Sequence, residues 1–204
     1  MNSYPAPSSG RGWKIGCLVV VGVFVVLLIG IGASFVSLYN KSVAFEEGVK
    51  EKWSEVENQL KRRYDLIPNL VETVKGYAKH EKEVFSEIAN ARKSYFSAKG
   101  VGDKAKASAG LERALSRLLM LREQYPNLKA NQNFLKLQDS LEGTENRIAV
   151  ARTRYNAAVK ELNAFVRSFF GRFFAAFTGV EQAEYFEIPD DMKETMDSPP
   201  TVGF

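Results

Sequence analysis

The hydrophobic and polar positions divide the chain into an apolar run and a longer region with a periodic pattern. The run extends from Ile15 to Asn40, 26 residues without a charged side chain. A helix needs about 20 apolar residues to cross a hydrocarbon core, so this run is long enough to span a membrane with some tilt. Trp13 and Tyr39 bracket it, where amphipathic rings favour the membrane interface. The pattern predicts a transmembrane anchor over residues 15–39.

A cleaved signal peptide is the alternative interpretation of this run. Its apolar region would cover about 7–15 residues and end at a small-residue cleavage site. Here the run is longer and continues into Phe35-Val36-Ser37-Leu38-Tyr39, so we interpret it as an uncleaved anchor. Two basic residues precede the run and three follow it closely, which leaves the positive-inside rule near a tie. Because the short N-terminal tail could cross the bilayer, the large domain is expected on the cytoplasmic side.

Beyond the anchor, apolar residues recur at intervals of three and four, the spacing of one helix face. The first of these positions are Val49, Trp53, Val56, Leu60, Tyr64 and Ile67. The pattern continues to Tyr95 and passes Pro68, which has no N–H and clashes with the carbonyl of Tyr64. We therefore expect a helix over about residues 43–97, kinked at Pro68 or divided there into two helices end to end.

Two further helices follow from the same periodicity. Residues 99–103 are typical of a helix end, a turn and a new helix start. A second helix is expected over about residues 103–125 and a third over about 128–168, because Tyr125-Pro126-Asn127 separates them. Loops of a few residues force long helices to lie antiparallel. The predicted fold class is therefore all-α, with an N-terminal transmembrane helix followed by a long antiparallel bundle of about three long helices.

The expected helix lengths bear on self-assembly. At about 1.5 Å per residue, the first helix would be roughly 80 Å long and the second roughly 35 Å. The second helix would then leave part of the apolar stripe of the first uncovered, for the third helix or other copies of the chain to cover. An uncovered stripe on a membrane-bound rod favours self-assembly in the manner of a coiled coil. A closed bundle with its own core is the equal alternative.

Composition restricts the chemistry of the chain. Cys17 is the single cysteine and His80 the single histidine, which excludes an intramolecular disulfide and a Cys/His zinc cluster. His80 lies among four charged residues and is expected to be exposed. The net charge of +4 is uneven: from residue 181 onward, seven acidic residues face one lysine, a charge of −6, which leaves +10 on residues 1–180. These features argue against a conventional enzyme, and no cofactor is predicted.

Three sequence blocks carry a resemblance to a known family. They are residues 61–81 (KRRYDLIPNLVETVKGYAKHE), 125–131 (YPNLKAN) and 141–156, which opens with LEGTENRIA. Together with Tyr185-Phe186, they resemble the LemA family of bacterial membrane proteins over about residues 15–204. The resemblance implies one N-terminal membrane helix and a long antiparallel helical domain, and it implies no activity. Some relatives are associated with bacterial organelle membranes, which favours a role in envelope organisation.

The predicted organisation has four parts. A short disordered tail rich in Ser and Pro covers residues 1–14, and the anchor covers residues 15–39. A LemA-like helical domain over residues 40–180 precedes an acidic, proline-bearing and flexible tail over residues 181–204.

Charged and amide side chains within the blocks are candidates for a polar network that sets the register of the helices. They are Arg62, Arg63, Asn69, Glu142, Glu145, Asn146 and Arg147. Asp139, Glu142 and Glu145 recur at a spacing of three, which brings carboxylates near one helix face. Such a group could serve acid–base chemistry or bind a divalent ion, but we favour an ion-pair network with Arg62 or Arg63. The same basic cluster could face anionic lipid, although roughly 30 Å of helix separates it from the anchor.

The segment over residues 165–177 contains six phenylalanines, two arginines and no acidic residue. It is too short, and too interrupted by the arginines, to span a membrane. It could lie in a membrane interface, cap the bundle or pack into a neighbouring subunit, and burial against protein is the favoured interpretation. The candidate contact residues are Phe169, Phe170, Arg172, Phe173 and Phe174.

These features predict a non-enzymatic, membrane-anchored helical scaffold at the bacterial cytoplasmic membrane. We expect it to form a homo-oligomer and to organise other envelope proteins or the membrane itself. Nucleic acid is not an expected partner, because the chain has no recognition motif or stacking platform, and no metal site is predicted. The alternative is a membrane-shaping or lipid-binding module that uses the phenylalanine-rich segment.

Overall fold

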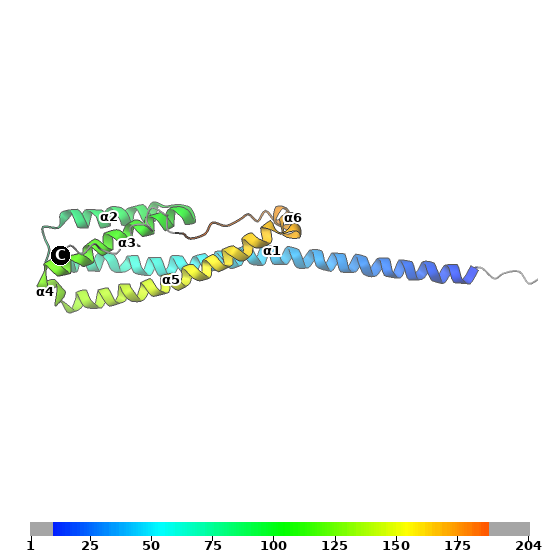
Figure 1. The fold of residues 1–204 in the computed structure, drawn as a ribbon, viewed down its shortest axis with the longest axis horizontal. Coiled ribbons are helices and arrows are strands. Elements are labelled where there is room, and N and C mark those ends of the chain that lie inside the picture. Colours follow the sequence, from blue (N-terminus) through cyan, green and yellow to red (C-terminus); the bar gives the residue numbers. More distant parts are fainter. Residues whose placement is uncertain (1–9, 188–204) are drawn as a thin grey trace, which may run out of the picture.

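The computed structural model describes residues 10–187, and within that range the chain forms α-helices and no strand (Figure 1). In chain order the helices are α1 (Gly10–Lys75), α2 (Lys82–Ser97), α3 (Gly100–Gln124), α4 (Pro126–Lys129), α5 (Gln132–Arg167) and α6 (Phe169–Thr178). The prediction of an all-α protein is confirmed.

Helix α1 is the long axis of the molecule. It contains 66 residues, which corresponds to roughly 100 Å of helix. Its N-terminal part extends alone beyond the bundle, and its C-terminal part lies beside α5, while α2 and α3 form a second pair along the far end (Figure 1). By length and composition, the apolar part of α1 is sufficient to cross a membrane, and the side chains of residues 16–37 are exposed.

The helix expected over residues 43–97 is wrong, because the chain reverses at residues 76–81. Helix α1 passes through Pro68 without a break, so two helices do not meet at the proline. The amides of Tyr77 and Ala78 both donate to the carbonyl of Val74, each at 2.9 Å, and α2 then runs back along the bundle. The prediction failed because Tyr77/Ala78 and Val84/Phe85 lie seven residues apart, a spacing that also fits one continuous helix.

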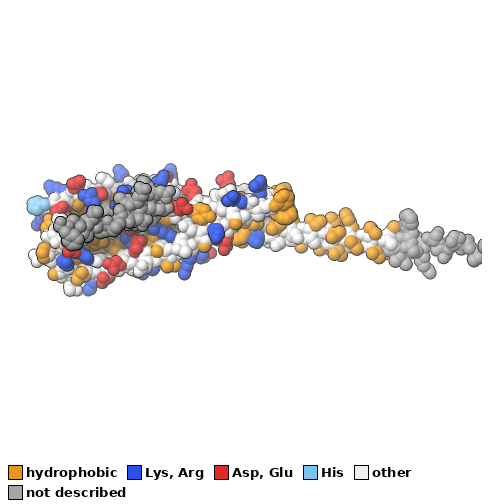
Figure 2. All heavy atoms as spheres, viewed as in Figure 1, with side chains coloured by type: hydrophobic (Ala, Val, Ile, Leu, Met, Phe, Trp, Pro, Cys, Tyr) orange, Lys and Arg blue, Asp and Glu red, His pale blue; other side chains and the backbone are white. Residues whose placement is uncertain are grey.

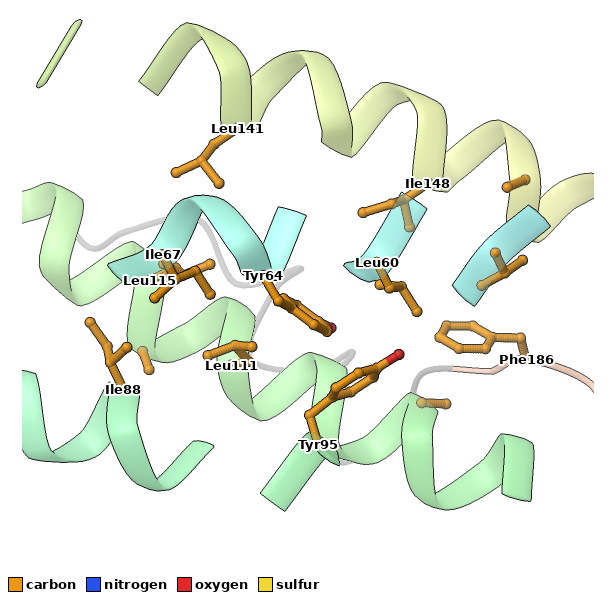
Figure 3. Packing of buried hydrophobic residues seen from close by; sticks show 14 of the residues in the cluster. Leu60, Tyr64, Ile67, Ile88, Tyr95, Leu111, Leu115, Leu141, Ile148 and Phe186 are labelled. Carbon is orange, nitrogen blue, oxygen red and sulfur yellow. The ribbon is translucent and has the colours of Figure 1, made fainter. Parts of the chain in front are cut away.

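The reversal places α2 and α3 over the apolar stripe of α1. Figure 3 shows Leu60, Tyr64 and Ile67 of α1 surrounded by side chains from the other long helices of the bundle. The contributing residues are Ile88 and Tyr95 of α2, Leu111 and Leu115 of α3, and Leu141 and Ile148 of α5. The rings of Tyr64 and Tyr95 meet edge to face with centroids 4.3 Å apart, an arrangement that adds to the energy of burial.

The bundle is therefore closed along this stripe. Val56, Leu60, Tyr64 and Ile67 are each at most 1 % exposed, as are the stripe residues that follow them in α1. The prediction of an uncovered stripe assumed one straight first helix, more than twice as long as the second. Because the chain reverses after Lys75, α2, α3 and α5 together cover the stripe of α1. Of the two alternatives left open, the structure has the closed core.

The second and third predicted helices are close to α3 and α5, with one short helix between them. Pro126 opens α4, where its missing N–H costs nothing. Asn131 caps α5, and its side chain accepts a hydrogen bond from the amide of Phe134 at 2.9 Å. At the other end of the chain, α1 begins at Gly10, inside the stretch expected to be a disordered tail; residues 1–9 lie outside the described residues.

Residues 180–187 form an extended strap along α5. Asn156 and Phe186 exchange two hydrogen bonds between side-chain amide and backbone, at 2.9 and 3.1 Å, and Asn163 and Ala183 exchange another two, both at 2.9 Å. Tyr155 adds a bond from its hydroxyl to the carbonyl of Glu184, at 2.7 Å. Residues 181–187 of the predicted flexible tail are thus held against the bundle, and residues 188–204 lie outside the described residues.

Candidate functional site: a buried charge network and an exposed phenylalanine face

Arg63 lies at the centre of a charge network that joins three helices. Its side chain is buried, and Nη2 donates to Oε2 of Glu112 on α3 at 2.9 Å. Its Nη1 donates to the carbonyl of Leu141 on α5 at 3.2 Å and lies 2.5 Å from Oε2 of Glu145, an ion pair whose angles fall outside hydrogen-bond geometry. One guanidinium therefore connects α1 with both α3 and α5.

The low exposure of this network shifts the protonation equilibria of its members. Burial raises the pKa of Glu112, and the nearby Arg63 opposes that shift. Burial also lowers the pKa of Arg152, while Glu112 and Glu145 oppose it. Arg63, Glu112 and Arg152 thus share a site with little access to solvent, and the partly exposed Glu145 lies at its edge.

Two of the seven residues predicted to form a polar register network belong to this charge network, and that the network sets the register of the helices stays a prediction. The structure brings Arg63 and Glu145 together. Within the described part of the chain, the other five are exposed and stand outside the network; they are Arg62, Asn69, Glu142, Asn146 and Arg147. Sequence reasoning missed Glu112 and Arg152 as members. Arg152 did carry a signal, because it occupies a core position of the periodic pattern between Ile148 and Tyr155.

The carboxylates considered for acid–base chemistry or a divalent ion do not converge. Asp139 and Glu142 point to solvent, and Glu142 accepts a hydrogen bond from Gln138 at 3.1 Å. Glu145 instead faces Arg63. Among residues 10–187, no three His, Cys, Asp or Glu side chains lie close enough to hold a metal ion. His80 is exposed in the reversal after α1, as expected.

An open groove of about 1020 Å³ lies beside the charge network, between α2 and α3. Glu112, Glu145 and Arg152 reach its floor, and Arg117 of α3 bridges to Glu87 of α2 at 2.5 Å. Its walls carry both signs of charge, so the groove has no strong preference for a charged ligand.

Helix α6 contains most of the phenylalanine-rich segment, and it is apolar on two faces. Phe174 and Ala175 are buried against the bundle, while Phe169 is 87 % exposed, Phe170 and Phe173 64 %, and Phe177 65 %. At about 100° per residue, these four exposed rings fall within an arc of about 100°. We call this set of four side chains the α6 face. Arg172 is exposed at its edge.

The buried side of α6 packs on α1 at the end of the apolar run. The ring of Phe174 lies edge to face with that of Phe35, with centroids 4.9 Å apart, and Phe177 meets Phe35 at 6.0 Å. Ser42 of α1 is fully buried and shares a hydrogen bond of 3.0 Å with Thr178. In Figure 2, hydrophobic side chains gather at the end of the bundle from which the apolar part of α1 emerges.

The turn from α5 into α6 brings the two helices into backbone contact. Ser168 ends α5 and caps α6, and its hydroxyl accepts from the amide of Gly171 at 3.1 Å. A Cβ on Gly171 would lie 1.9 Å from the carbonyl oxygen of Phe165, so only glycine fits there. Gly179 then ends α6 in a left-handed conformation, with φ of 73°, and its amide donates a hydrogen bond to the carbonyl of Ala175.

The sequence-based interpretation of this segment is thus partly changed. Burial against protein was the favoured fate of the segment, and the structure buries Phe174 as one of the five candidate contact residues. Phe169, Phe170, Arg172 and Phe173 are exposed, and they remain available for contacts outside the chain.

The fold and these two features define a class of protein in which one long helix carries an apolar run beyond an antiparallel helical bundle. Residues 52–204 match the LemA family, and the chain belongs to that family. Magnetosome proteins MamQ 1 and MamQ 2 of Paramagnetospirillum magneticum are each 30 % identical to it, over 87 % of this chain and 74 % of theirs. Magnetosome protein MamQ of Magnetospirillum gryphiswaldense is 26 % identical, over 82 % of this chain and 71 % of its own. The resemblance drawn from the sequence blocks is confirmed.

Proposed function

We propose that this protein is a non-enzymatic membrane scaffold in which α1 crosses the bilayer and holds the bundle as a rigid post. One observation carries the proposal: α1 continues without a break from the apolar run into the core of the bundle. Asn40 and Lys41, where the run ends, lie inside this helix, and the buried stripe begins at Val49. The bundle therefore has no linker between itself and the span.

The length and rigidity of α1 would hold the surface of the bundle at a fixed distance from the membrane. From Lys41 to Lys75, α1 extends for roughly 50 Å at 1.5 Å per residue. Helix α6 braces the junction through Phe35 and Ser42, which opposes bending where the helix leaves the membrane. Partners bound to the outer faces of the bundle would be held at a defined distance from the bilayer.

The names of the relatives support a membrane-organising role. They are called magnetosome proteins, and we propose that this chain likewise acts at a bacterial membrane. We place the span in the cytoplasmic membrane and the bundle on its cytoplasmic side, where the short N-terminal tail is the part that crosses.

Self-association of the scaffold stays a prediction with a changed basis. The stripe of α1 is covered within the chain, so copies would have to meet through the apolar part of α1, the α6 face or the outer surface of the bundle. Mass photometry of the full chain in nanodiscs measures the copy number directly. A single copy per disc at every protein-to-disc ratio would contradict self-association and leave the post intact.

The post is tested by energy transfer from two sites to acceptor-labelled lipid headgroups. In a Cys17→Ser background, donors are placed at Ala44→Cys beside the apolar run and at Ala130→Cys at the far end, both at exposed positions. We expect strong transfer from Ala44→Cys and weak transfer from Ala130→Cys. Equal transfer from both sites, or extraction of the protein from vesicles by alkaline carbonate, would overturn the proposal.

A further inference from the structure

We infer that the α6 face is a lipid-binding surface, which lies in the headgroup and upper acyl region of the leaflet from which α1 emerges. The span and α6 together would give the post two contacts with the same membrane. The inference rests on the proposed membrane anchoring and deepens it, by assigning a partner, the lipid bilayer, to a surface that the anchor itself does not require.

Position along α1 is the first argument. A hydrocarbon core of about 30 Å accommodates about 20 residues of the apolar run, so the last residues of the run lie at headgroup level. Phe35 and Tyr39 are at this end of the run, and both rings contact Phe177 of α6. A bilayer that surrounds the run therefore reaches α6.

The distribution of side chains on α6 is the second argument. A helix at the end of a water-soluble bundle ordinarily presents polar residues to solvent and apolar ones to the core. On α6 the outward side carries Phe169, Phe170, Phe173 and Phe177, and Thr178, the polar residue next to the last of these, faces inward to Ser42. Four exposed aromatic rings on one short helix form the kind of surface that marks an interaction site.

The apolar surface that α6 shares with the span, and the positive charge around it, favour lipid as the partner of the α6 face. The α6 face merges with the exposed side of Phe35 and Tyr39, so it continues the apolar surface of the span itself. Residues 162–180 contain no acidic side chain, and Arg167 and Arg172 are exposed in this stretch, where their guanidinium groups can pair with lipid phosphates. This combination of aromatic rings and arginines is typical of helices that lie in a membrane interface.

The attachment of α6 to the bundle explains why it would act as a brace. Gly171 lets the backbone of α6 pack on Phe165 of α5, and the bond between Thr178 and Ser42 fixes the other end to α1. Insertion of the α6 face would therefore restrain the tilt of the whole bundle, because α6 cannot move independently of α1 and α5.

The inference is tested by the depth of a fluorescent probe in full-length protein. An environment-sensitive label is attached at Ala176→Cys, an exposed site beside the α6 face, in a Cys17→Ser background, with Ser116→Cys on α3 as the matched aqueous control. The protein is reconstituted in vesicles of phosphatidylcholine and phosphatidylglycerol that carry nitroxide lipids. We expect a blue shift at Ala176→Cys with quenching strongest for nitroxides near the headgroups, and neither effect at Ser116→Cys. A water-like spectrum without quenching would overturn the inference.

A second copy of the chain is the competing occupant, and the same probe separates it. Burial against protein would shift the spectrum without lipid quenching, and the shift would fade as the protein is diluted in lipid. That outcome would replace lipid by a protein partner and overturn the inference.

A paired variant separates the inference from the proposed anchoring. In Phe169→Ser/Phe173→Ser, we expect loss of quenching at Ala176→Cys and increased transfer from Ala130→Cys to lipid headgroups, because the post tilts. Resistance to carbonate extraction should be unchanged, since the span is intact. Met120→Ser, at an exposed apolar residue of α3, is the control that should alter none of these readouts. Unchanged quenching and transfer in the paired variant would contradict the role of the α6 face while leaving the scaffold standing.

Discussion

Arg63 of α1 and Glu112 of α3 meet across the bundle, with Nη2 and Oε2 separated by 2.9 Å. The arginine is buried and the carboxylate is largely so, which means that neither charge can recover its hydration if the other is removed. We therefore predict that the pair acts by fixing how the returning hairpin of α2 and α3 sits on α1, more than by adding to the net stability of the fold.

Replacement of the arginine should expose this dependence. Arg63→Ala leaves the largely buried Glu112 without its hydrogen-bonded cation, and breaking a buried pair costs about 3–5 kcal/mol. We expect the free energy of unfolding to fall by about that amount, measured by urea denaturation of the detergent-solubilised chain followed by circular dichroism.

The neighbouring residue provides the control for that measurement. Arg62 is exposed, and Arg62→Ala should change the free energy of unfolding by less than about 0.5 kcal/mol. Similar losses for both substitutions would mean that the charge of the helix, and not the buried contact, is responsible.

The carboxylate of this pair should also make stability depend on pH. Burial raises the pKa of Glu112 above its value in the unfolded chain, against the attraction of Arg63 and Arg152 and with the repulsion of Glu145. A raised pKa means that folding favours the protonated acid, so the contribution of Glu112 is greatest below its unfolded pKa and is lost as the pH rises through the folded value. Glu112→Gln keeps the shape and cannot ionise.

The variant should therefore gain stability relative to the natural chain as the pH rises from below 4.5, the unperturbed pKa of glutamate. Melting temperatures of both proteins across the acidic range measure this difference, and other acids cancel in the comparison. A difference that is constant with pH, or that runs in the opposite direction, would contradict the raised pKa of Glu112.

The spacing of apolar residues predicts the helices well because each helix buries one face. The sequence predicts a single apolar stripe from Val49 to Ile67. The structure confirms that these positions lie on one helix, α1, and buries most of them. The reversal after Lys75 escapes the same reasoning, because Tyr77/Ala78 and Val84/Phe85 continue the pattern on either side of a polar interruption. A periodic pattern records which residues are buried and does not record which way the chain turns.

Contacts between helices are harder to predict than the helices themselves. The sequence names Glu145 as one of several carboxylates and leaves Arg62 and Arg63 as alternative partners, and only the folded molecule shows that Arg63 is the one beside Glu145. Glu112 was missed, because nothing in one sequence says that α3 returns to this side of α1. Helix α6 packs on Phe35, which is far from it in the sequence. This contact determines which side of α6 is buried, so the exposure of Phe169 and Phe173 could only be found in the folded molecule.

The close approach of α6 to α5 makes a further prediction about glycine. In Gly171→Ala the added methyl group would overlap the carbonyl oxygen of Phe165, and such overpacking costs about 1–3 kcal/mol or more. Gly48→Ala in α1 has open space around the new methyl group and should instead stabilise the helix by about 0.5–1 kcal/mol. Thermal unfolding of the two variants should therefore shift in opposite directions, and a shared direction would show that the contact at Gly171 relaxes freely.

The strap along α5 depends on a small number of side chains. Asn156 both donates to and accepts from the backbone of Phe186, which leaves that residue hydrogen-bonded as if it lay in a sheet. The ring of Phe186 is buried and lies 4.4 Å from the guanidinium of Arg152. The strap therefore has one polar and one apolar attachment at the same residue.

Loss of the polar attachment should open the strap while the bundle stays folded. Asn156→Ala removes two hydrogen bonds worth about 0.5–1.5 kcal/mol each, so amide exchange over residues 180–187 should accelerate by roughly 5- to 150-fold. Exchange in α2 and α3 should be unchanged, and hydrogen–deuterium exchange read by mass spectrometry resolves both regions. Asn146→Ala, at an exposed position of the same helix, should leave the strap as protected as in the natural chain. Equal acceleration in both variants would mean that the effect does not come from the bonds of Asn156. Unchanged exchange in Asn156→Ala would mean that the other attachments of the strap, among them Asn163 and the buried Phe186, are sufficient to keep it on α5.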